Sequence, residues 1–221
     1  MHFSKDTLNT IGINSDSPRR LPWDKSHAIR PPNLAPFLTL PYISSFDMEA
    51  SWCFDLDDEF LRTMAIAWPH LESFTIDPAG SWPKSADCRL TVAGLLPIVQ
   101  HCSRISAISC RLEGNVPSVY SAGDVYEDAK FEPAKDVLCL TVGDSCVSDV
   151  ENVAVYIYKM FPYLEEIYSW DDKDNDEQPN REMWDSVECW VKRLGTVCYQ
   201  ERKRAHAKYC KEDNCSHLKE I

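Results

Sequence analysis

Four side chains near the end of the chain are of the types that bind zinc. His206, Cys210, Cys215 and His217 lie within twelve residues of one another. Zinc sites usually pair their ligands as CxxC or HxxxH. The order H-x3-C-x4-C-x-H contains neither pair, and the flanking residues are highly charged. We therefore expect no metal at this place.

An acidic run over residues 171–177 has part of the spacing of a calcium loop. Asp172, Asp174 and Asp176 match positions 1, 3 and 5 of an EF-hand. Glu177 stands where the loop needs Gly, and Met183 stands where it needs a bidentate Glu. We interpret the run as a solvated loop. The seven glycines form neither GxGxxG nor GxxxxGK[ST], so the sequence predicts no cofactor.

Gly143-Asp144-Ser145 follows an apolar run and is similar to the nucleophile block of GDSL-type esterases. That resemblance implies a base from a C-terminal Asp-x-x-His, but here Asp213 and His217 are four residues apart. Nucleophilic catalysis needs a nucleophile, a base and an orienting group together. We interpret Asp144 and Ser145 as a turn after a strand. A serine hydrolase that uses Ser145 remains the alternative.

The charge balance narrows the range of partners. The chain has 221 residues, with 23 Lys and Arg against 35 Asp and Glu, and a formal net charge of −12. Nucleic acids and anionic membranes are bound by clustered Lys and Arg, so we expect neither as a partner.

Residues 1–30 lack the apolar run of about 7–15 residues that a secretory signal needs. We therefore expect an intracellular protein with reduced cysteines, most of them core residues. Examples are Cys102, Cys110, Cys146, Cys189 and Cys198.

Five segments place apolar residues at relative positions 1, 4 and 6, a pattern that predicts strands with one buried face. The triplets are Ile43, Phe46 and Met48; Leu71, Phe74 and Ile76; Ile105, Ile108 and Cys110; Val137, Leu140 and Val142; and Leu164 and Ile167 with the weaker Ser169. Their starts are 28, 34, 32 and 27 residues apart. The spacing resembles the LxxLxL skeleton of leucine-rich repeats with longer helical arms.

Helical patterns follow these strands. We expect helices from Asp57 to Trp68, from Thr91 to Cys102 and from Ser148 to Phe161, each with a polar cap, and a shift or kink at Pro97. A longer helix over 181–203 has an apolar stripe and can close the last edge of the sheet. The stripe is Trp184, Val187, Trp190, Val191, Leu194 and Cys198.

These patterns divide the chain into three parts. Residues 1–33 are expected to be a disordered tail or linker, 34–205 a leucine-rich-repeat-like domain, and 206–221 a charged flexible tail. A first strand at 43–48 would leave an unpaired edge. We expect residues 1–40 to fold back over that edge, or further chain to precede it.

The blocks LDDEFLRTMAIAWPHLESFTIDPAG, RLTVAGLLPIVQHCSRI, VLCLTVGDSC and FPYLEEIYSW, in this order, resemble the F-box/leucine-rich-repeat-like family of mushroom-forming fungi. The resemblance covers residues 34–205 and implies a horseshoe of strand–helix repeats. In that family an N-terminal F-box docks a Skp-type adaptor of a ubiquitin ligase, and the repeats select a client. Residues 1–33 are too short and too polar for an F-box, so adaptor binding is in doubt and only client recognition is expected.

The residues between the apolar triplet positions should form a concave binding face. The candidate partner-binding residues are Asp47, Glu49, Glu72, Asp77, Arg111, Glu165, Glu166, Tyr168 and Trp170. Acidic side chains dominate, which favours a partner with a basic segment, with Tyr168 and Trp170 as anchors. The alternative is that the face is polar simply because it is hydrated.

The sequence as a whole predicts an α/β protein, a short irregular leucine-rich-repeat-like solenoid of about five units with a C-terminal capping helix. The expected function is non-catalytic protein recognition, and the resemblance implies client binding for a ubiquitin ligase. A third possibility is a degenerate paralogue without a partner.

Overall fold

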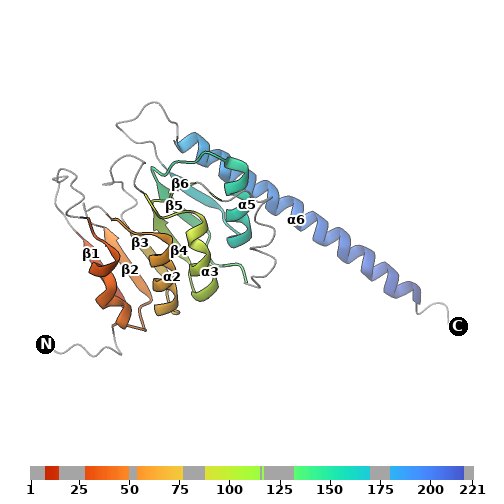
Figure 1. Cartoon of the computed structure of the whole chain (residues 1–221). Coiled ribbons are helices and arrows are strands. Elements are labelled where there is room, and N and C mark those ends of the chain that lie inside the picture. Colours follow the sequence, from red (N-terminus) through yellow and green to blue (C-terminus); the bar gives the residue numbers. More distant parts are fainter. Residues whose placement is uncertain are drawn as a thin grey trace.

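The computed structural model describes residues 8–14, 28–49, 54–76, 88–114, 116, 132–169 and 180–216. The fold is mixed α/β (Figure 1). Its elements are β1 (Thr10–Asn14), α1 (Pro31–Leu34), η2 (Ala35–Thr39), β2 (Ser45–Glu49), α2 (Asp58–Ala67), β3 (Ser73–Ile76), η3 (Ala93–Leu95), α3 (Leu96–His101), β4 (Ala107–Cys110), β5 (Cys139–Gly143), α5 (Val150–Met160), β6 (Glu166–Ser169) and α6 (Asn180–Ser216).

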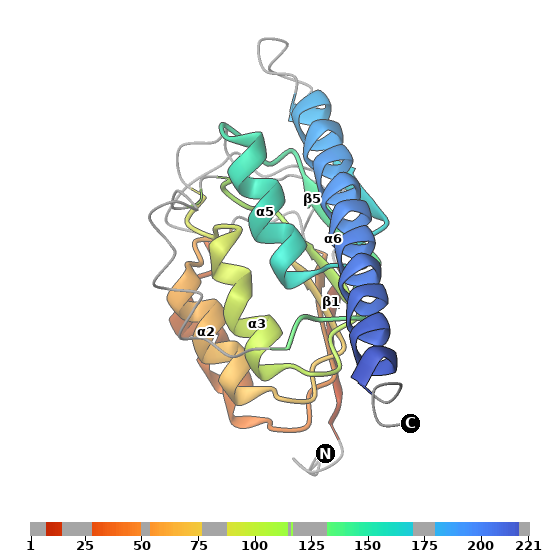
Figure 2. The ribbon, with the colours of Figure 1, turned by 90° about the vertical axis from the view of Figure 1, so that its right-hand side faces the viewer.

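The six strands form one parallel sheet in the order of the chain, from β1 to β6. Each strand therefore lies beside the strands that precede and follow it in sequence. Helices α2, α3 and α5 line one side of this sheet, and α6 runs along its β6 end (Figure 2). We call the side away from α2, α3 and α5 the open face.

The predicted apolar triplets form the core between the sheet and its helices. Every member of the five triplets is buried except Ser169, which is half-buried. Positions 4 and 6 lie within the strands and point to the helix side, because side chains alternate along a strand. The prediction of which strand residues face the core is confirmed.

One of the three predicted caps, Asp57, lies at the start of its helix as expected. Asp57 accepts a hydrogen bond from the Phe60 amide at 3.0 Å, and so caps α2. Thr91 accepts a hydrogen bond from the Gly94 amide at 3.1 Å ahead of the 3-10 turn η3, and α3 itself has no side-chain cap. Pro97 lies in the first turn of α3, whose start is shifted by the preceding 3-10 turn. The cap of α5 is Asp149, which accepts from the Asn152 amide at 3.1 Å, and not Ser148 as the capping-box pattern indicated.

The N-terminal prediction needs one correction. Residues 10–14 are not part of a tail: they form β1, which pairs with β2 through Ile11 beside Phe46 and Ile13 beside Met48. The short TIGIN segment carries too little apolar pattern to stand out, but the exposed edge of β2 gives it backbone partners. Of the two expected options, the covering of the β2 edge by the preceding chain is confirmed for residues 10–14.

The C-terminal helix is longer than predicted. It continues from Asn180 to Ser216, so residues 206–216 are helical and not a flexible tail. The charged stretch after Tyr199 is rich in Glu, Arg, Lys and Ala, which all have high helix propensity. Apolar periodicity ends there because the helix leaves the body of the protein (Figure 1).

Helix α6 covers the β6 edge of the sheet. Trp184, Val187 and Val191 are buried, as the stripe predicts, whereas Trp190 is 38% exposed and does not belong to the packed face. The Glu188 carboxylate accepts a hydrogen bond from the Ile167 amide of β6 at 2.7 Å. A side chain thus satisfies a backbone donor that the edge strand would otherwise leave to solvent.

Candidate functional site

The open face carries two rows of side chains, one residue from each strand in register. The first row is Thr10, Ser45, Ser73, Ala107, Cys139 and Glu166; the second is Gly12, Asp47, Thr75, Ser109, Thr141 and Tyr168. All of these side chains are exposed or half-buried, in contrast to the buried positions between them. Small residues fill the middle of both rows.

Charged groups lie toward the two ends of these rows. Asp47 lies on β2, and its Oδ1 accepts no hydrogen bond although that atom is buried; this holds for the part of the chain that the structure describes. Glu166 lies on β6, where its carboxylate accepts a hydrogen bond from the Tyr168 hydroxyl. That bond raises the pKa of Tyr168, because the carboxylate favours the protonated phenol.

A third row lies where the strands begin. Ser44, Glu72, Ser106, Leu138 and Glu165 occupy equivalent places, and all but the half-buried Ser44 are exposed. The chain passes from unit to unit in the same way: the Glu72 amide donates to the Ser44 carbonyl at 2.7 Å, and the Ser106 amide donates to the Glu72 carbonyl at 2.9 Å. The repeated backbone geometry fixes the spacing between these side chains.

The β6 end of the open face combines negative charge with exposed apolar groups. Leu138 and Tyr168 are exposed, beside Glu165 and Glu166. The pKa of the nearby Cys139 thiol is raised by partial burial and by the charges of these two carboxylates. Leu138 and Cys139 were not among the predicted partner-binding residues. The strand pattern could have identified both residues, but they were not chosen because neither is charged or aromatic.

The predicted partner-binding residues are only partly brought together. Asp47, Glu49, Glu72, Glu165, Glu166 and Tyr168 are exposed or half-buried on the sheet, whereas Asp77 and Trp170 lie outside the described residues. Arg111 was wrongly predicted to face the partner. It is buried, and its Nε lies 3.3 Å from the Asp144 carboxylate in an ion pair whose side chains are 3% and 8% exposed.

Ser145, the candidate nucleophile, is fully buried. Its Oγ donates to the Val142 carbonyl and accepts from the Leu112 amide at 2.7 Å. Gly143 before it has a φ of 65°, in the left-handed region that favours glycine and turns the chain away from β5. The turn interpretation of Asp144 and Ser145 is confirmed. A substrate has no access to this hydroxyl.

The same turn holds the start of α6. The Trp184 indole Nε1 donates to the Ser145 carbonyl at 2.8 Å, and the side-chain Nδ2 of Asn180 donates to the Asp144 carbonyl at 3.1 Å. The residues that resemble an esterase block therefore serve to attach the C-terminal helix. Sequence alone did not show this role, because Ser145 and Trp184 are 39 residues apart.

The cysteines of the described part are free thiols. Burial raises the pKa of Cys88 to about 11 and that of Cys102 to about 12, so both stay protonated and unreactive at neutral pH. Cys102 and Cys110 are buried as expected, but Cys189 is exposed on α6. Within the described residues no group of three or more His, Cys, Asp or Glu side chains is arranged to hold a metal ion.

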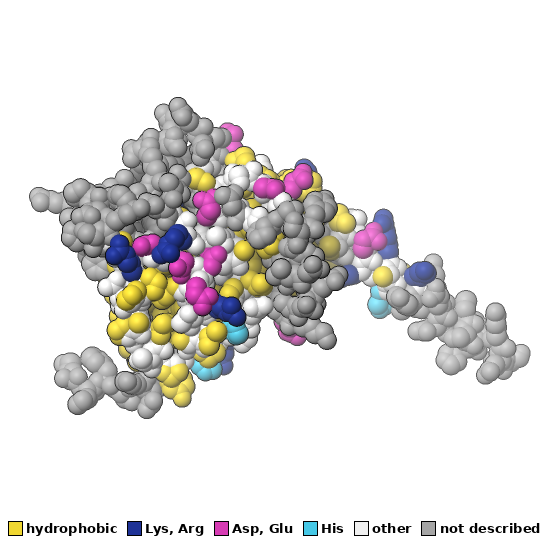
Figure 3. Space-filling view, viewed as in Figure 1, with side chains coloured by type: hydrophobic (Ala, Val, Ile, Leu, Met, Phe, Trp, Pro, Cys, Tyr) yellow, Lys and Arg dark blue, Asp and Glu magenta, His cyan; other side chains and the backbone are white. Residues whose placement is uncertain are grey.

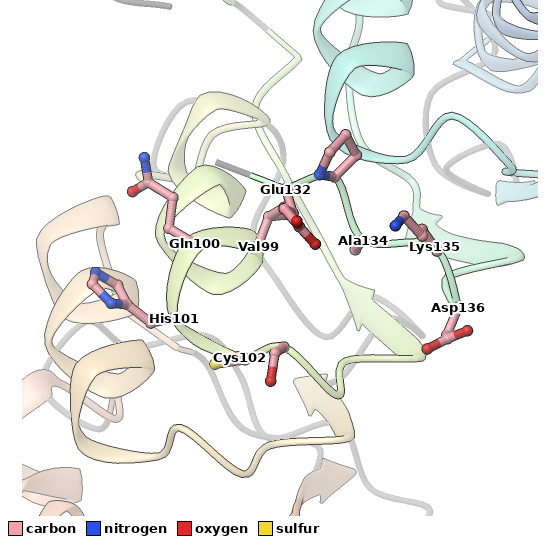
Figure 4. Close-up of a pocket in the computed structure, with 10 residues that line it drawn as sticks. Val99, Gln100, His101, Cys102, Glu132, Ala134, Lys135 and Asp136 are labelled. Carbon is pink, nitrogen blue, oxygen red and sulfur yellow. The ribbon is translucent and has the colours of Figure 1, made fainter. Parts of the chain in front are cut away.

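A hollow of about 530 Å³ lies between α3 and the segment 132–136 (Figure 4). Glu132 points toward Val99 at its centre, while Gln100 and His101 lie on the far side of α3 from this segment. Lys135 and Asp136 lie at the opposite end. Because these polar groups do not converge on one point, they form no acid–base or nucleophile–base pair.

Hydrophobic side chains gather over α1, η2 and α2 on the helix-covered side (Figure 3). They line a groove of about 420 Å³ that includes Pro31, Ala35, Leu38 and Phe60. The groove also borders Asp57, but this carboxylate caps α2 and pairs with Arg89. The groove thus offers packing surface and no reactive group.

Comparisons with protein-family models, with curated proteins and with solved structures found no match to this chain. No helix within the described residues combines the length and the apolar character needed to cross a membrane.

Proposed function

We propose that this protein is a non-catalytic protein-recognition module, a short leucine-rich-repeat-like solenoid whose open face binds a partner segment with basic residues. The sequential parallel strand order, with helices on one side, supports the solenoid description. Repeat proteins of this kind use the extended surface of the sheet for binding.

One observation carries the proposal. The two in-register rows form a strip whose middle carries small side chains, with Asp47 toward one end and Glu166 with Tyr168 at the other. An extended segment can lie along such a strip, with Lys or Arg side chains reaching the carboxylates.

The sequence resemblance extends this proposal to client binding for an F-box-type ubiquitin ligase. We keep this as the narrower form of the proposed function. Mixing the full chain with a purified Skp-type adaptor tests it. Stable co-elution supports a place in a ligase, and separate elution removes the ligase from the proposal but leaves the recognition face.

The recognition face is tested by titrating a peptide of alternating Lys and Ser into the full chain. We expect binding that weakens at least about tenfold in the variant Glu165→Lys/Glu166→Lys, because two attractive contacts become repulsive. The matched control Glu151→Lys/Glu182→Lys changes the net charge equally at two exposed helix positions. Equal weakening in both variants would mean that only net charge matters, and would remove the open face from the proposal.

The hydrolase alternative has a separate test. A generic acyl ester is incubated with the wild type and with Ser145→Ala. We expect no turnover by either, because the Ser145 hydroxyl is buried and donates to a backbone carbonyl. Turnover by the wild type that Ser145→Ala abolishes would overturn the non-catalytic proposal.

A further inference from the structure

The far half of α6 differs in charge from the rest of the molecule. Residues 202–211 contain five Lys and Arg and no Asp or Glu. The remaining chain has 18 of the 23 Lys and Arg and all 35 Asp and Glu. A concentrated positive segment is thus attached to a strongly negative body, and the two attract each other.

This segment does not pack on the body of its own molecule. Val191 is the last buried residue of α6 within the described part, and the helix runs on to Ser216. At 1.5 Å per residue, residues 197–211 form an arm of about 21 Å, and the helix extends away from the sheet (Figure 1). A continuous helix cannot turn back onto its own open face, so an acidic partner surface must come from another molecule.

One face of the arm joins apolar and basic groups. Trp190, Val197 and Arg204 are seven residues apart and therefore share a side of the helix, with Lys208 one turn beyond Arg204. All four are exposed, Val197 at 55%. The acid on this stripe, Glu201, pairs with Arg204.

The open face has the complementary combination. Its β6 end presents Leu138 and Tyr168 beside Glu165 and Glu166. Glu72 lies at the start of β3, three strands from β6. Six strands at about 4.8 Å spacing give a sheet about 24 Å wide, so an arm of about 21 Å can cover most of its width. The match therefore holds in length, charge and apolar character.

We propose that the basic arm of α6, residues 197–211, docks on the open face of a second copy of this chain. Two copies related by a two-fold axis would each give an arm and accept one, which closes the assembly as a dimer. Pairing of two arms with each other is disfavoured, because each brings the same positive charge to the contact. This proposal rests on the proposed function, because it uses the same face of the sheet. It adds the identity of the partner bound there, a second copy of this chain.

A polyanion such as a nucleic acid is the competing partner for a basic arm. The observations favour the second copy, because the acidic body that accompanies each arm repels a polyanion and attracts another arm. Nucleic-acid binding is therefore an outcome of the test and would count against the proposal.

The test is sedimentation velocity of the full chain at low and high salt. We expect a dimer at about 50 mM salt that dissociates at about 500 mM, since screening shortens the reach of exposed charges. The variant Arg204→Glu/Lys208→Glu should weaken the dimer at least about tenfold. The matched control Arg62→Glu/Lys135→Glu, which reverses two exposed charges elsewhere, should change it by less than about threefold.

Charge exchange makes the test specific for the two surfaces. Adding Glu165→Lys/Glu166→Lys to the arm variant should restore association, because an acidic arm then meets a basic face. Circular dichroism of each variant checks that α6 is intact, and the salt dependence of the wild type tests the proposal even if a variant fails to fold. Failure of the combined variant to recover, with all variants folded, would overturn the proposal.

Other outcomes separate this proposal from the proposed function. A wild-type chain that stays monomeric at low salt but binds the Lys-Ser peptide overturns the dimer and leaves the recognition face. A monomer that binds no peptide overturns both. A dimer insensitive to the arm charges, such as one formed by β1 edges, or tight arm-dependent binding of an oligonucleotide, overturns the arm-to-face contact.

Discussion

The two ends of the sheet are held in different ways. At the N-terminal end, Arg89 joins Asp55 and Asp57 at 2.8 and 3.0 Å, and Arg30 joins Asp55 at 3.2 Å, with side chains that are 34–50% exposed. At the C-terminal end, Arg111 and Asp144 form a buried pair. Exposed pairs contribute little to stability, whereas a buried pair that loses one partner is strongly destabilising.

The two edges of the sheet differ in the same way as the ion pairs, because the C-terminal edge is more deeply buried than the N-terminal edge. The β6 edge is covered by α6, which inserts Trp184 and supplies Glu188 to the Ile167 amide. On the β1 edge, Ile11 is the one buried residue of the strand among the described side chains. We conclude that the C-terminal end anchors the fold and that the N-terminal end is the weaker one. Four experiments test this difference, from the largest expected effect to the smallest.

Trp184→Ala should have the largest effect. The indole is fully buried and donates to the Ser145 carbonyl, so its loss leaves a cavity and an unpaired acceptor. We expect the free energy of unfolding to fall by about 3–5 kcal/mol in urea titrations. The control Trp190→Ala, on the exposed side of the same helix, should lose less than about 1 kcal/mol. Similar losses would show that α6 is not anchored through Trp184.

Arg111→Met compared with Arg89→Met tests the two ion pairs directly. Arg111→Met leaves the buried Asp144 carboxylate without its Arg and should lower the free energy of unfolding by about 3 kcal/mol. Arg89→Met removes a half-exposed Arg and should lower it by less than about 1 kcal/mol. Thermal and urea unfolding measure both. A larger loss in Arg89→Met would reverse the comparison between the two ends.

Glu188→Ala should have an intermediate effect. It removes the acceptor for the Ile167 amide and the partner of Lys192, which lies 2.6 Å away. We expect a loss of about 1–2 kcal/mol and faster hydrogen exchange at Ile167. Glu188→Gln keeps a carbonyl acceptor and should keep most of the protection. Slow exchange at Ile167 in Glu188→Ala would mean that α6 protects the edge by coverage alone.

The smallest effect is expected when the pH is lowered and Asp55, in its ion-pair cluster with Arg89 and Arg30, becomes protonated. Burial acts to raise the pKa of Asp55, but hydrogen bonds and charges from Arg89 and Arg30 outweigh it and hold the pKa below its usual value. A lowered pKa in the folded state stabilises the fold above the unfolded-state pKa near 4, and this contribution is lost as the pH falls through the folded-state pKa. The stability gap between wild type and Asp55→Asn should therefore be small at neutral pH and close as the pH falls through the folded-state pKa of Asp55. A gap that widens in acid would contradict this.

Local patterns predicted much of the fold because the relevant forces act between near neighbours. The triplets such as Leu71, Phe74 and Ile76 follow from side-chain alternation, and the Asp57 cap follows from a contact three residues away. β1 was missed because TIGIN has little pattern of its own and is a strand only beside β2. The extent of α6 was missed because apolar periodicity reports packing and not helix propensity alone.

The candidate site was predictable only in part for the same reason. The acidic residues Glu72, Glu165 and Glu166 follow from the strand register and are exposed as expected. Arg111 follows the same register in sequence, but it comes just after the last residue of β4, where the chain leaves the sheet and turns inward toward Asp144. Alternation holds only while the backbone stays extended, so it fails at the strand end.

The sequence by itself determined the apolar face of the five predicted strands, the order of these strands and of the helices that follow them, and the charge contrast between the body and residues 202–211, because these depend on residue type and spacing. The tertiary structure alone decided that Ser145 is a buried attachment point for α6, that β1 completes the sheet and that the basic arm stands away from its own acidic face. Each of these depends on groups far apart in the chain that only folding brings together or keeps apart.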